Sequence, residues 1–293
     1  MKWEGNRESE NVEDRRGDGG GGGGLGGIGG RSVGIGTVVI ALVASYFFGV
    51  SPGTVINVLN GGGMPAQEAT QGPAKAPPAD DREARFVSTV LADTEDVWTT
   101  IFQKAGQTYS KPRLVLFSGR TQTACGTGQT ASGPFYCPGD RKIYIDLSFY
   151  RLMQERFKVS GEFAQAYVIA HEVGHHVQNL MGIMDKVDQL RRSSTPTQGN
   201  ALSVKVELQA DCFAGVWAKN ADKARSILES GDVETALNAA TAIGDDALQK
   251  QAQGYVVPDS FTHGTSAQRV RWFKRGLDSG QVSACNTFDA RTL

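Results

Sequence analysis

Apolar residues recur at helical spacing through most of the chain beyond residue 80. Over 80–104, Phe86, Val90, Trp98 and their neighbours form a narrow stripe, which predicts an amphipathic helix. The same spacing predicts a helix over 161–181 and a second long helix over 201–220. Shorter helices are expected over 148–157, 232–242, 245–253 and 266–277, and a polar loop over 189–199.

Two short segments have the pattern of β-strands. Residues 113–117 form a mostly apolar run, and 142–147 alternate between apolar and polar positions. The stretch 124–141 between them is rich in Gly and Pro and predicts a loop. Together these segments predict an α+β fold that is mainly helical and contains a small sheet.

One segment near the N-terminus, residues 32–50, carries no charged side chain: SVGIGTVVIALVASYFFGV. A helix of this length would cover about 28 Å, close to the hydrocarbon thickness of a bilayer. A cleaved signal peptide is disfavoured, because the long stretch before the segment contains many acidic residues. A buried core helix is an alternative, but the pattern favours a single transmembrane helix.

The segments on either side of 32–50 have few apolar residues. Residues 1–31 are polar and then glycine-rich, and 51–79 are rich in Pro and Gly, so a disordered tail and a flexible linker are expected. Arg15, Arg16 and Arg31 precede the hydrophobic segment, whereas Lys75 is the first basic residue after it. The positive-inside rule then predicts a cytoplasmic N-terminus and a globular domain, 80–293, outside the cytoplasm.

The charge balance limits the choice of partners. The formal net charge is −1, from 30 basic and 31 acidic residues. An excess of basic residues would indicate nucleic acid as a partner, and the chain has no such excess. The expected partners are therefore the membrane and the ligand of whatever site the domain carries.

The segment His171-Glu172-Val173-Gly174-His175 has the form H-E-x-x-H and falls in the predicted helix over 161–181. Positions i and i+4 share one face of a helix, so His171 and His175 can bind one Zn²⁺. Glu172 lies beside the first ligand, where its carboxylate can reach a metal-bound water. The chain has only four histidines, and three fall within this short stretch. A metal site on this helix is therefore the main functional prediction.

A hydrolytic zinc site usually has a third protein ligand. His176 points about 100° away from His175 and is expected on the helix edge. Glu207 is the preferred ligand, because it follows His175 at a distance that allows a turn and a return helix. Asp211, on the same helix face, is expected to accept the free N–H of a ligand histidine. Asp211 as the ligand itself and His263 as the ligand remain alternatives.

Four cysteines outside the cytoplasm favour disulfide bonds. Cys125–Cys137 is the preferred pair, since it would close the glycine-rich loop between the strands. Cys212–Cys285 follows by elimination. A buried free thiol at Cys212 is the alternative for that pair.

With these residues placed, the chain resembles the neutral zinc metallopeptidase family of bacterial membrane-anchored proteins, which includes the YpfJ-type proteins. The resemblance covers the opening Trp3-Glu4-Gly5, the run from Ser9 to Gly17 and the hydrophobic segment. It also covers His171 to Gln178, the run Glu207 to Gly215, and His263-Gly264 with Gln268 to Arg271. It implies a zincin-like metallopeptidase domain. The Glu-x-x-x-Asp spacing resembles the glutamate-zincin arrangement, which supports Glu207 over Asp211 as the ligand.

These residues predict a zinc-dependent hydrolase that acts on a peptide or protein substrate. Glu172 would serve as the general base for a water whose pKa zinc lowers to roughly 7. His263 or Arg269 would help to hold the oxyanion. By analogy of fold, the strand over 142–146 would bind an extended peptide along its edge. The alternative is a zinc-stabilised, membrane-tethered binding module without proteolytic activity, for which Glu172 would have no use.

Overall fold

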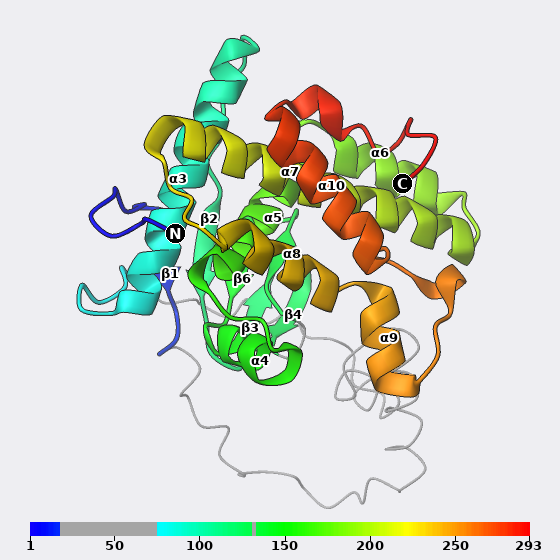
Figure 1. Ribbon diagram of the computed structural model, residues 1–293, viewed down its shortest axis with the longest axis horizontal. Helices are drawn as coiled ribbons and strands as arrows, with labels where there is room; N and C mark the ends of the chain where they lie inside the picture. Colours follow the sequence, from blue (N-terminus) through cyan, green and yellow to red (C-terminus); the bar gives the residue numbers. More distant parts are fainter. Residues whose placement is uncertain (18–74, 131–132) are drawn as a thin grey trace, which may run out of the picture. The chain divides into compact units, whose positions relative to one another are not determined.

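A four-stranded sheet lies against a group of packed helices in the computed structural model, which describes residues 1–17, 75–130 and 133–293 (Figure 1). The order of the strands is β1-β2-β6-β5; β1, β2 and β6 are parallel, and β5 runs antiparallel to β6. The strands are β1 (Val12–Asp14), β2 (Arg113–Leu116), β5 (Phe135–Cys137) and β6 (Lys142–Ile145). A separate hairpin joins β3 (Arg120–Thr123) to β4 (Gly126–Gln129).

The alternation of side chains along the strands divides them between two apolar clusters. Leu114, Leu116 and Ile143 belong to the main core, which the sheet shares with the helices. Val115 and Tyr144 point to the other face, into a smaller cluster with Phe117 and Cys137. The sheet is therefore buried on both faces at its centre.

Three helices organise the main core: α3 (Arg82–Lys104), α5 (Glu162–Leu180) and α7 (Pro196–Arg225). They pack against one another, and α10 (Ser266–Ser279) packs against α7. A Cβ atom at Gly276 would collide with the carbonyl oxygen of Cys212, so only glycine allows α10 this approach to α7. The remaining helices are α4 (Ser148–Phe157), α6 (Ile183–Arg192), α8 (Asp232–Ala242), α9 (Asp245–Gln253) and the short 3-10 turns η3 (Pro258–Ser260) and η4 (Val282–Cys285).

The mainly helical architecture with a small sheet confirms the predicted fold class at this level. Two local predictions are wrong. The stretch 189–199 is not a loop, because α6 extends to Arg192 and buries Val187 against the domain. The stretch 124–141 is not simply a loop either, since β4 and β5 lie within it.

Residues 1–17 differ most from the prediction of a disordered tail over 1–31. Strand β1 pairs with β2 over three residues, from Val12 opposite Leu114 to Asp14 opposite Leu116. Trp3 is 4% exposed and packs edge-on against Phe86 of α3. Apart from Trp3 and Val12 the segment has few apolar residues, and backbone pairing and ion pairs hold the rest of it. The prediction is therefore wrong for residues 1–17, while 18–31 lie outside the described residues.

The predicted span, 32–50, and the predicted linker up to residue 74 also lie outside the described residues. No helix within residues 1–17, 75–130 and 133–293 has the length and hydrophobicity needed to cross a membrane. The end of the linker is ordered, since the amide of Asp14 donates a hydrogen bond to the carbonyl of Lys75.

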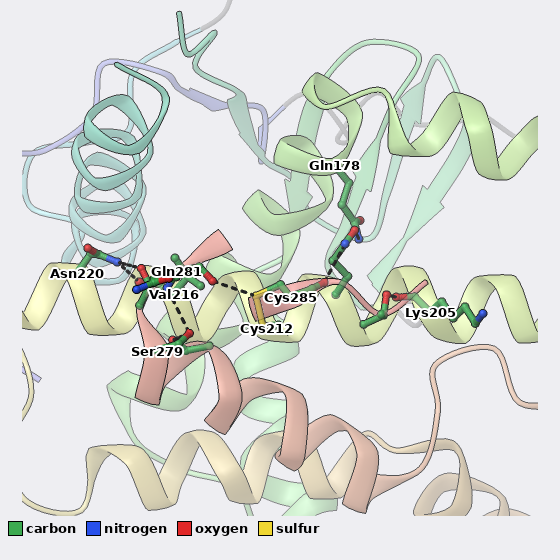
Figure 2. The surroundings of a disulfide bond; sticks show 12 residues. Gln178, Lys205, Cys212, Val216, Asn220, Ser279, Gln281 and Cys285 are labelled. Atoms are coloured by element: carbon green, nitrogen blue, oxygen red, sulfur yellow. Dashed lines mark hydrogen bonds between the residues drawn. A yellow bond between two sulfur atoms is a disulfide. The ribbon is translucent and has the colours of Figure 1, made fainter. Parts of the chain in front are cut away.

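Both predicted disulfides are confirmed. Cys125 bonds to Cys137 beside the hairpin, and Cys212 of α7 bonds to Cys285 of η4 (Figure 2). Cys212 is therefore not a free thiol. The second bond ties the last turn of the chain to α7, and α7 carries part of the candidate site.

Candidate metal centre

The two helices that carry the candidate ligands cross closely. Gly174 lies between the two histidines of the H-E-x-x-H motif, and a Cβ atom there would lie 3.0 Å from the carbonyl oxygen of Ala210. Absence of a side chain at Gly174 therefore lets α7 approach α5. As a result, residues on α7 face the motif histidines directly.

Three side chains converge at this crossing. Nε2 of His171 lies 3.1 Å from Oε2 of Glu207, and Nε2 of His175 lies 3.4 Å from Oε1 of the same carboxylate. The two Nε2 atoms are 3.2 Å apart. The donor atoms of all three residues lie within 4.8 Å of one another. The structure thus brings together the three residues that the sequence predicts as ligands.

The other nitrogen of each ring has its own buried partner. Nδ1 of His171 lies 2.8 Å from Oδ1 of Asp211, and Nδ1 of His175 lies 2.9 Å from Oε1 of Gln178. A carboxylate can only accept a hydrogen bond, so His171 donates from Nδ1 to Asp211. The predicted contact between Asp211 and a ligand histidine is therefore present.

Asp211 is fully buried, and two further side chains compensate its charge. Arg269 donates from Nε and Nη2 to the two carboxylate oxygens at 2.8 and 2.9 Å. The hydroxyl of Tyr167 donates to Oδ1 at 2.5 Å. Burial acts to raise the pKa of Asp211, but Arg269 and His171 outweigh it and lower that pKa to about 2. Asp211 therefore stays ionised beside His171.

Electrostatics also favour a cation between the ligands. Burial acts to lower the pKa of His171, but Asp211 and Glu207 outweigh it and raise that pKa to about 10. Burial acts to raise the pKa of Glu207, yet the two histidines hold it well below its ordinary value. Both imidazole rings present Nε2 to the same point as a carboxylate. This donor set, two imidazoles and one carboxylate, fits Zn²⁺.

Glu172 and His176 are both buried on α5, but they have different neighbours. Glu172 is 7% exposed and lines the same cavity as the ligands, and burial raises the pKa of its carboxyl. His176 is fully buried: its Nε2 lies 2.6 Å from the carbonyl oxygen of Ser110, and its Nδ1 lies 3.1 Å from the hydroxyl of Tyr136. The expectation that His176 lies at the helix edge is therefore wrong, because it fills the space between α5 and the sheet.

A cavity of about 660 Å³ opens over the ligands. His171, Glu172, His175 and Glu207 line it. Apolar side chains of α4 and α6 form much of its walls, and Arg156, Asp188 and Arg191 also line it. The cavity has the size of a small-ligand site and could hold several side chains of a peptide.

His263 and Arg269, the two candidates for oxyanion contact, have different surroundings. Both line the cavity. The side chain of His263 is half exposed, and its Nδ1 lies 3.1 Å from Oδ1 of Asp245. This hydrogen bond, together with the charge of Glu207, raises the pKa of His263. Arg269 is 2% exposed and its guanidinium is bound to Asp211, Tyr167 and the carbonyl of Ile243. Arg269 is therefore a structural partner of Asp211, and His263 is the side chain left to face a ligand.

The expected role of the strand over 142–146 as a binding edge is wrong. Strand β6 lies between β2 and β5, so both of its edges are already paired. The strands at the two edges of the sheet are β1 and β5, and it is β5 whose residues Phe135 and Tyr136 line the cavity. Strand β5 could not be predicted from the sequence, because a three-residue strand inside a Gly- and Pro-rich stretch gives no periodic signal.

Three further residues of the site, Tyr167, Gln178 and Asp245, were not predicted from the sequence. Tyr167 lies one helical turn before His171, and Gln178 lies three residues after His175, so helical spacing could have indicated both. Asp245 begins α9 and gives no such signal, because its contact with His263 depends on the tertiary fold.

Comparisons with known proteins show which family the chain resembles. A family described as "Putative neutral zinc metallopeptidase" matches residues 1–288. The chain is 52% identical over 291 residues to YpfJ of Escherichia coli strain K12, which covers 98% of this chain and 99% of the relative. It is 40% identical over 220 residues to Rv2575 of Mycobacterium tuberculosis, covering 71% of this chain and 73% of the relative. Both relatives are named as uncharacterized proteins. No solved structure matches the chain.

Proposed function

The chain belongs to the neutral zinc metallopeptidase family, and we propose that it is a zinc-dependent metallopeptidase with a zincin-like catalytic domain. The observation that carries this proposal is the convergence of His171, His175 and Glu207 in the lining of a cavity that also contains Glu172. A site that only stabilised the fold would typically have four protein ligands and would not need this acid.

The residues of the chain have distinct roles in this proposal. His171, His175 and Glu207 would hold Zn²⁺, which when bound supplies a Lewis acid for a carbonyl oxygen and acidifies water. Glu172 takes the proton of the attacking water and passes it to the leaving amine. Burial favours this proton exchange, because it raises the pKa of the Glu172 carboxyl toward neutral pH. His263, held by Asp245, donates a hydrogen bond to the oxyanion.

The substrate in this proposal is a peptide or an unfolded segment of a protein. An extended peptide would add to the free edge of β5 and so pass over the ligands. Support comes from the position of β5 at the sheet edge and from the contribution of Phe135 and Tyr136 to the cavity wall.

The test is hydrolysis of fluorescently labelled casein by the full-length, zinc-loaded protein. Glu172→Gln should reduce the rate by about 10²–10⁴-fold, because it removes the general base. The same variant should still bind zinc, since Glu172 is not a ligand. Arg192→Gln, on the exposed end of α6, is the control and should cleave like the wild type. Equal cleavage by Glu172→Gln would refute the assigned base. A wild-type protein that binds zinc but cleaves no substrate would favour the binding module.

We also propose that the hydrophobic segment 32–50 attaches the protein to the membrane, with the catalytic domain outside the cytoplasm. The two disulfides support an oxidising compartment. The pairing of β1 with β2 supports a different arrangement from the one the arginines suggest: residues 1–17 belong on the same side of the membrane as the domain. A strand cannot share backbone hydrogen bonds with a neighbour across a bilayer. In this proposal the segment 32–50 would therefore attach to the membrane without crossing it once, in place of the single transmembrane helix that the sequence pattern favours.

A further inference from the structure

The hydrogen bonds behind His175 form a directed chain of side-chain amides. Gln178 accepts from or donates to three groups: Nδ1 of His175 at 2.9 Å, the carbonyl oxygen of Val206 at 2.7 Å and Oε1 of Gln209 at 3.0 Å. The amide nitrogen of Gln209 in turn lies 2.9 Å from the carbonyl oxygen of Cys285. Gln178, Gln209 and Cys285 are all buried, so water does not offer alternative partners.

The direction of this chain follows from its two ends. A backbone carbonyl can only accept, so the carbonyls of Val206 and Cys285 require the nitrogen of each glutamine amide. Gln209 must then present its oxygen to Gln178, and Gln178 must present its oxygen to His175. Reversing either amide would place two oxygen atoms against each other.

Only one tautomer of His175 fits this arrangement. The oxygen of Gln178 accepts a hydrogen bond, so Nδ1 of His175 carries the hydrogen atom. In a neutral imidazole the other nitrogen, Nε2, is then unprotonated. Nε2 is the atom that faces His171 and Glu207.

Cys285, at which this row of hydrogen bonds ends, is held to α7 by a covalent bond. Cys285 supplies the terminal carbonyl, and its sulfur is bonded to Cys212. The hydroxyl of Thr287 donates to the carbonyl of Lys205 at 2.7 Å, which fastens the same segment further along α7. Figure 2 shows Gln178 reaching from α5 toward α7 beside the Cys212–Cys285 disulfide.

We propose that Gln178 and Gln209 are positioning residues that hold His175 as the Nδ1–H tautomer, and that the disulfide-bonded C-terminal segment anchors them. Gln178 also joins α5 to the backbone of Val206, the residue before Glu207, so it sets the spacing of two of the three ligands. The proposal rests on the metal site of the proposed function, but not on cleavage of a substrate.

The experiment measures the dissociation constant of Zn²⁺ with the full-length protein, in competition with a chromophoric chelator. Gln178→Leu should bind zinc about 10- to 100-fold more weakly, the usual effect of losing a hydrogen-bond partner of a ligand histidine. Gln178→Glu keeps an oxygen that can accept from Nδ1 of His175 and loses only the contacts to Val206 and Gln209, so its affinity should lie closer to that of the wild type. Gln165→Leu, on the same helix but away from the ligands, is the matched control and should bind like the wild type. Wild-type affinity in Gln178→Leu would overturn the proposal.

The other disulfide of the chain, Cys125–Cys137, provides a control for the anchor. Cys212→Ala/Cys285→Ala should weaken zinc binding about tenfold. Cys125→Ala/Cys137→Ala should not change it, because neither cysteine contacts a ligand or its partners. Equal affinity of the two double variants would overturn the role of the C-terminal segment.

Nuclear magnetic resonance of ¹⁵N-histidine in the zinc-bound wild type tests the tautomer without any substitution. With four histidines in the chain, the ring signals can be assigned by single substitutions. A hydrogen on Nδ1 of His175 is expected, and a hydrogen on Nε2 would contradict the proposal. A protein that binds zinc tightly but cleaves nothing would refute the peptidase and leave the positioning role intact. A protein that does not bind zinc would refute both.

Discussion

The two candidate histidine ligands differ in the charge of the group behind them. His171 donates to the ionised carboxylate of Asp211, whereas His175 faces the neutral amide of Gln178. The carboxylate in turn requires a cation, and Arg269 supplies it from α10. A side chain nearly sixty positions away from Asp211 thus determines whether a buried negative charge beside His171 is tolerated.

Arg269→Ala should therefore lower the free energy of unfolding by about 3–5 kcal/mol, because it leaves Asp211 buried without its cation. Arg269→Lys should lie in between, since lysine keeps the charge but loses the two-pronged contact. The measurement is urea unfolding of the zinc-free protein. Arg271→Ala is the control: this residue is exposed on the same helix, and its loss should change stability by less than about 0.5 kcal/mol. Equal stability of the two alanine variants would contradict the role of Arg269.

His176 should make stability depend on pH. Burial lowers its pKa to about 4, from an ordinary value of about 6.5. Below pH 6.5 the unfolded chain takes up a proton that the folded protein resists, so the free energy of unfolding should fall as the pH drops toward 4. The contribution amounts to about 3 kcal/mol.

The measurement compares urea unfolding at pH 7 and pH 4.5, in the presence of a chelator. The loss of stability between the two pH values should be smaller in His176→Gln than in the wild type. His263→Gln should not reduce this loss, because the pKa of His263 is shifted upward. The same loss in His176→Gln and in the wild type would show that His176 is not the group responsible.

Among the elements, helices with strong periodicity could be predicted from the sequence, and the pairing of short strands could not. The helices α4, α8 and α9 have their predicted bounds, because their apolar positions repeat at helical spacing. Glu207 could be predicted for the same reason, since a helix returning after His175 brings it to the motif. Strand β1 gave no signal, because Val12 is its single apolar residue and its stability comes from pairing with β2, about a hundred residues away.

The integration of β1 predicts that the N-terminal segment contributes to stability. Trp3→Ala should lower the free energy of unfolding by about 3–5 kcal/mol, since it removes a large buried side chain from contact with Phe86. Urea unfolding of the full-length protein measures this. Glu4→Ala is the control, because its side chain is exposed and its ion pair with Arg82 lies at the surface. A Trp3→Ala variant as stable as the control would mean that the segment is not part of the folded domain.

For the molecule as a whole, ion pairs tie the N-terminal arginines to the domain. Arg16 contacts Asp14 and Asp81, and Arg7 contacts Glu95 and Asp96. Glu95 is fully buried, and it also accepts hydrogen bonds from Ser9 and Asn11. Arg15 and Arg16, two of the three arginines that suggested a cytoplasmic N-terminus, are thus paired with carboxylates of the folded domain, while Arg31 lies outside the described residues. The positive-inside rule applies to loops beside a membrane span. The charges of Arg15 and Arg16 are accounted for by their ion pairs with Glu13, Asp14 and Asp81.

The prediction is that Glu10 and Lys274, both exposed, lie on the same side of the membrane. Glu10→Cys and Lys274→Cys would each be expressed as full-length protein in bacteria and treated with a membrane-impermeant maleimide, before and after lysis. Because β1 reaches β2 only within the folded domain, both positions should react to the same extent in intact cells whose outer membrane is permeabilised. Reaction at Lys274→Cys with protection at Glu10→Cys would place β1 on the other side of the membrane. In that case β1 could not pair with β2, and the sheet of the mature protein would begin at β2.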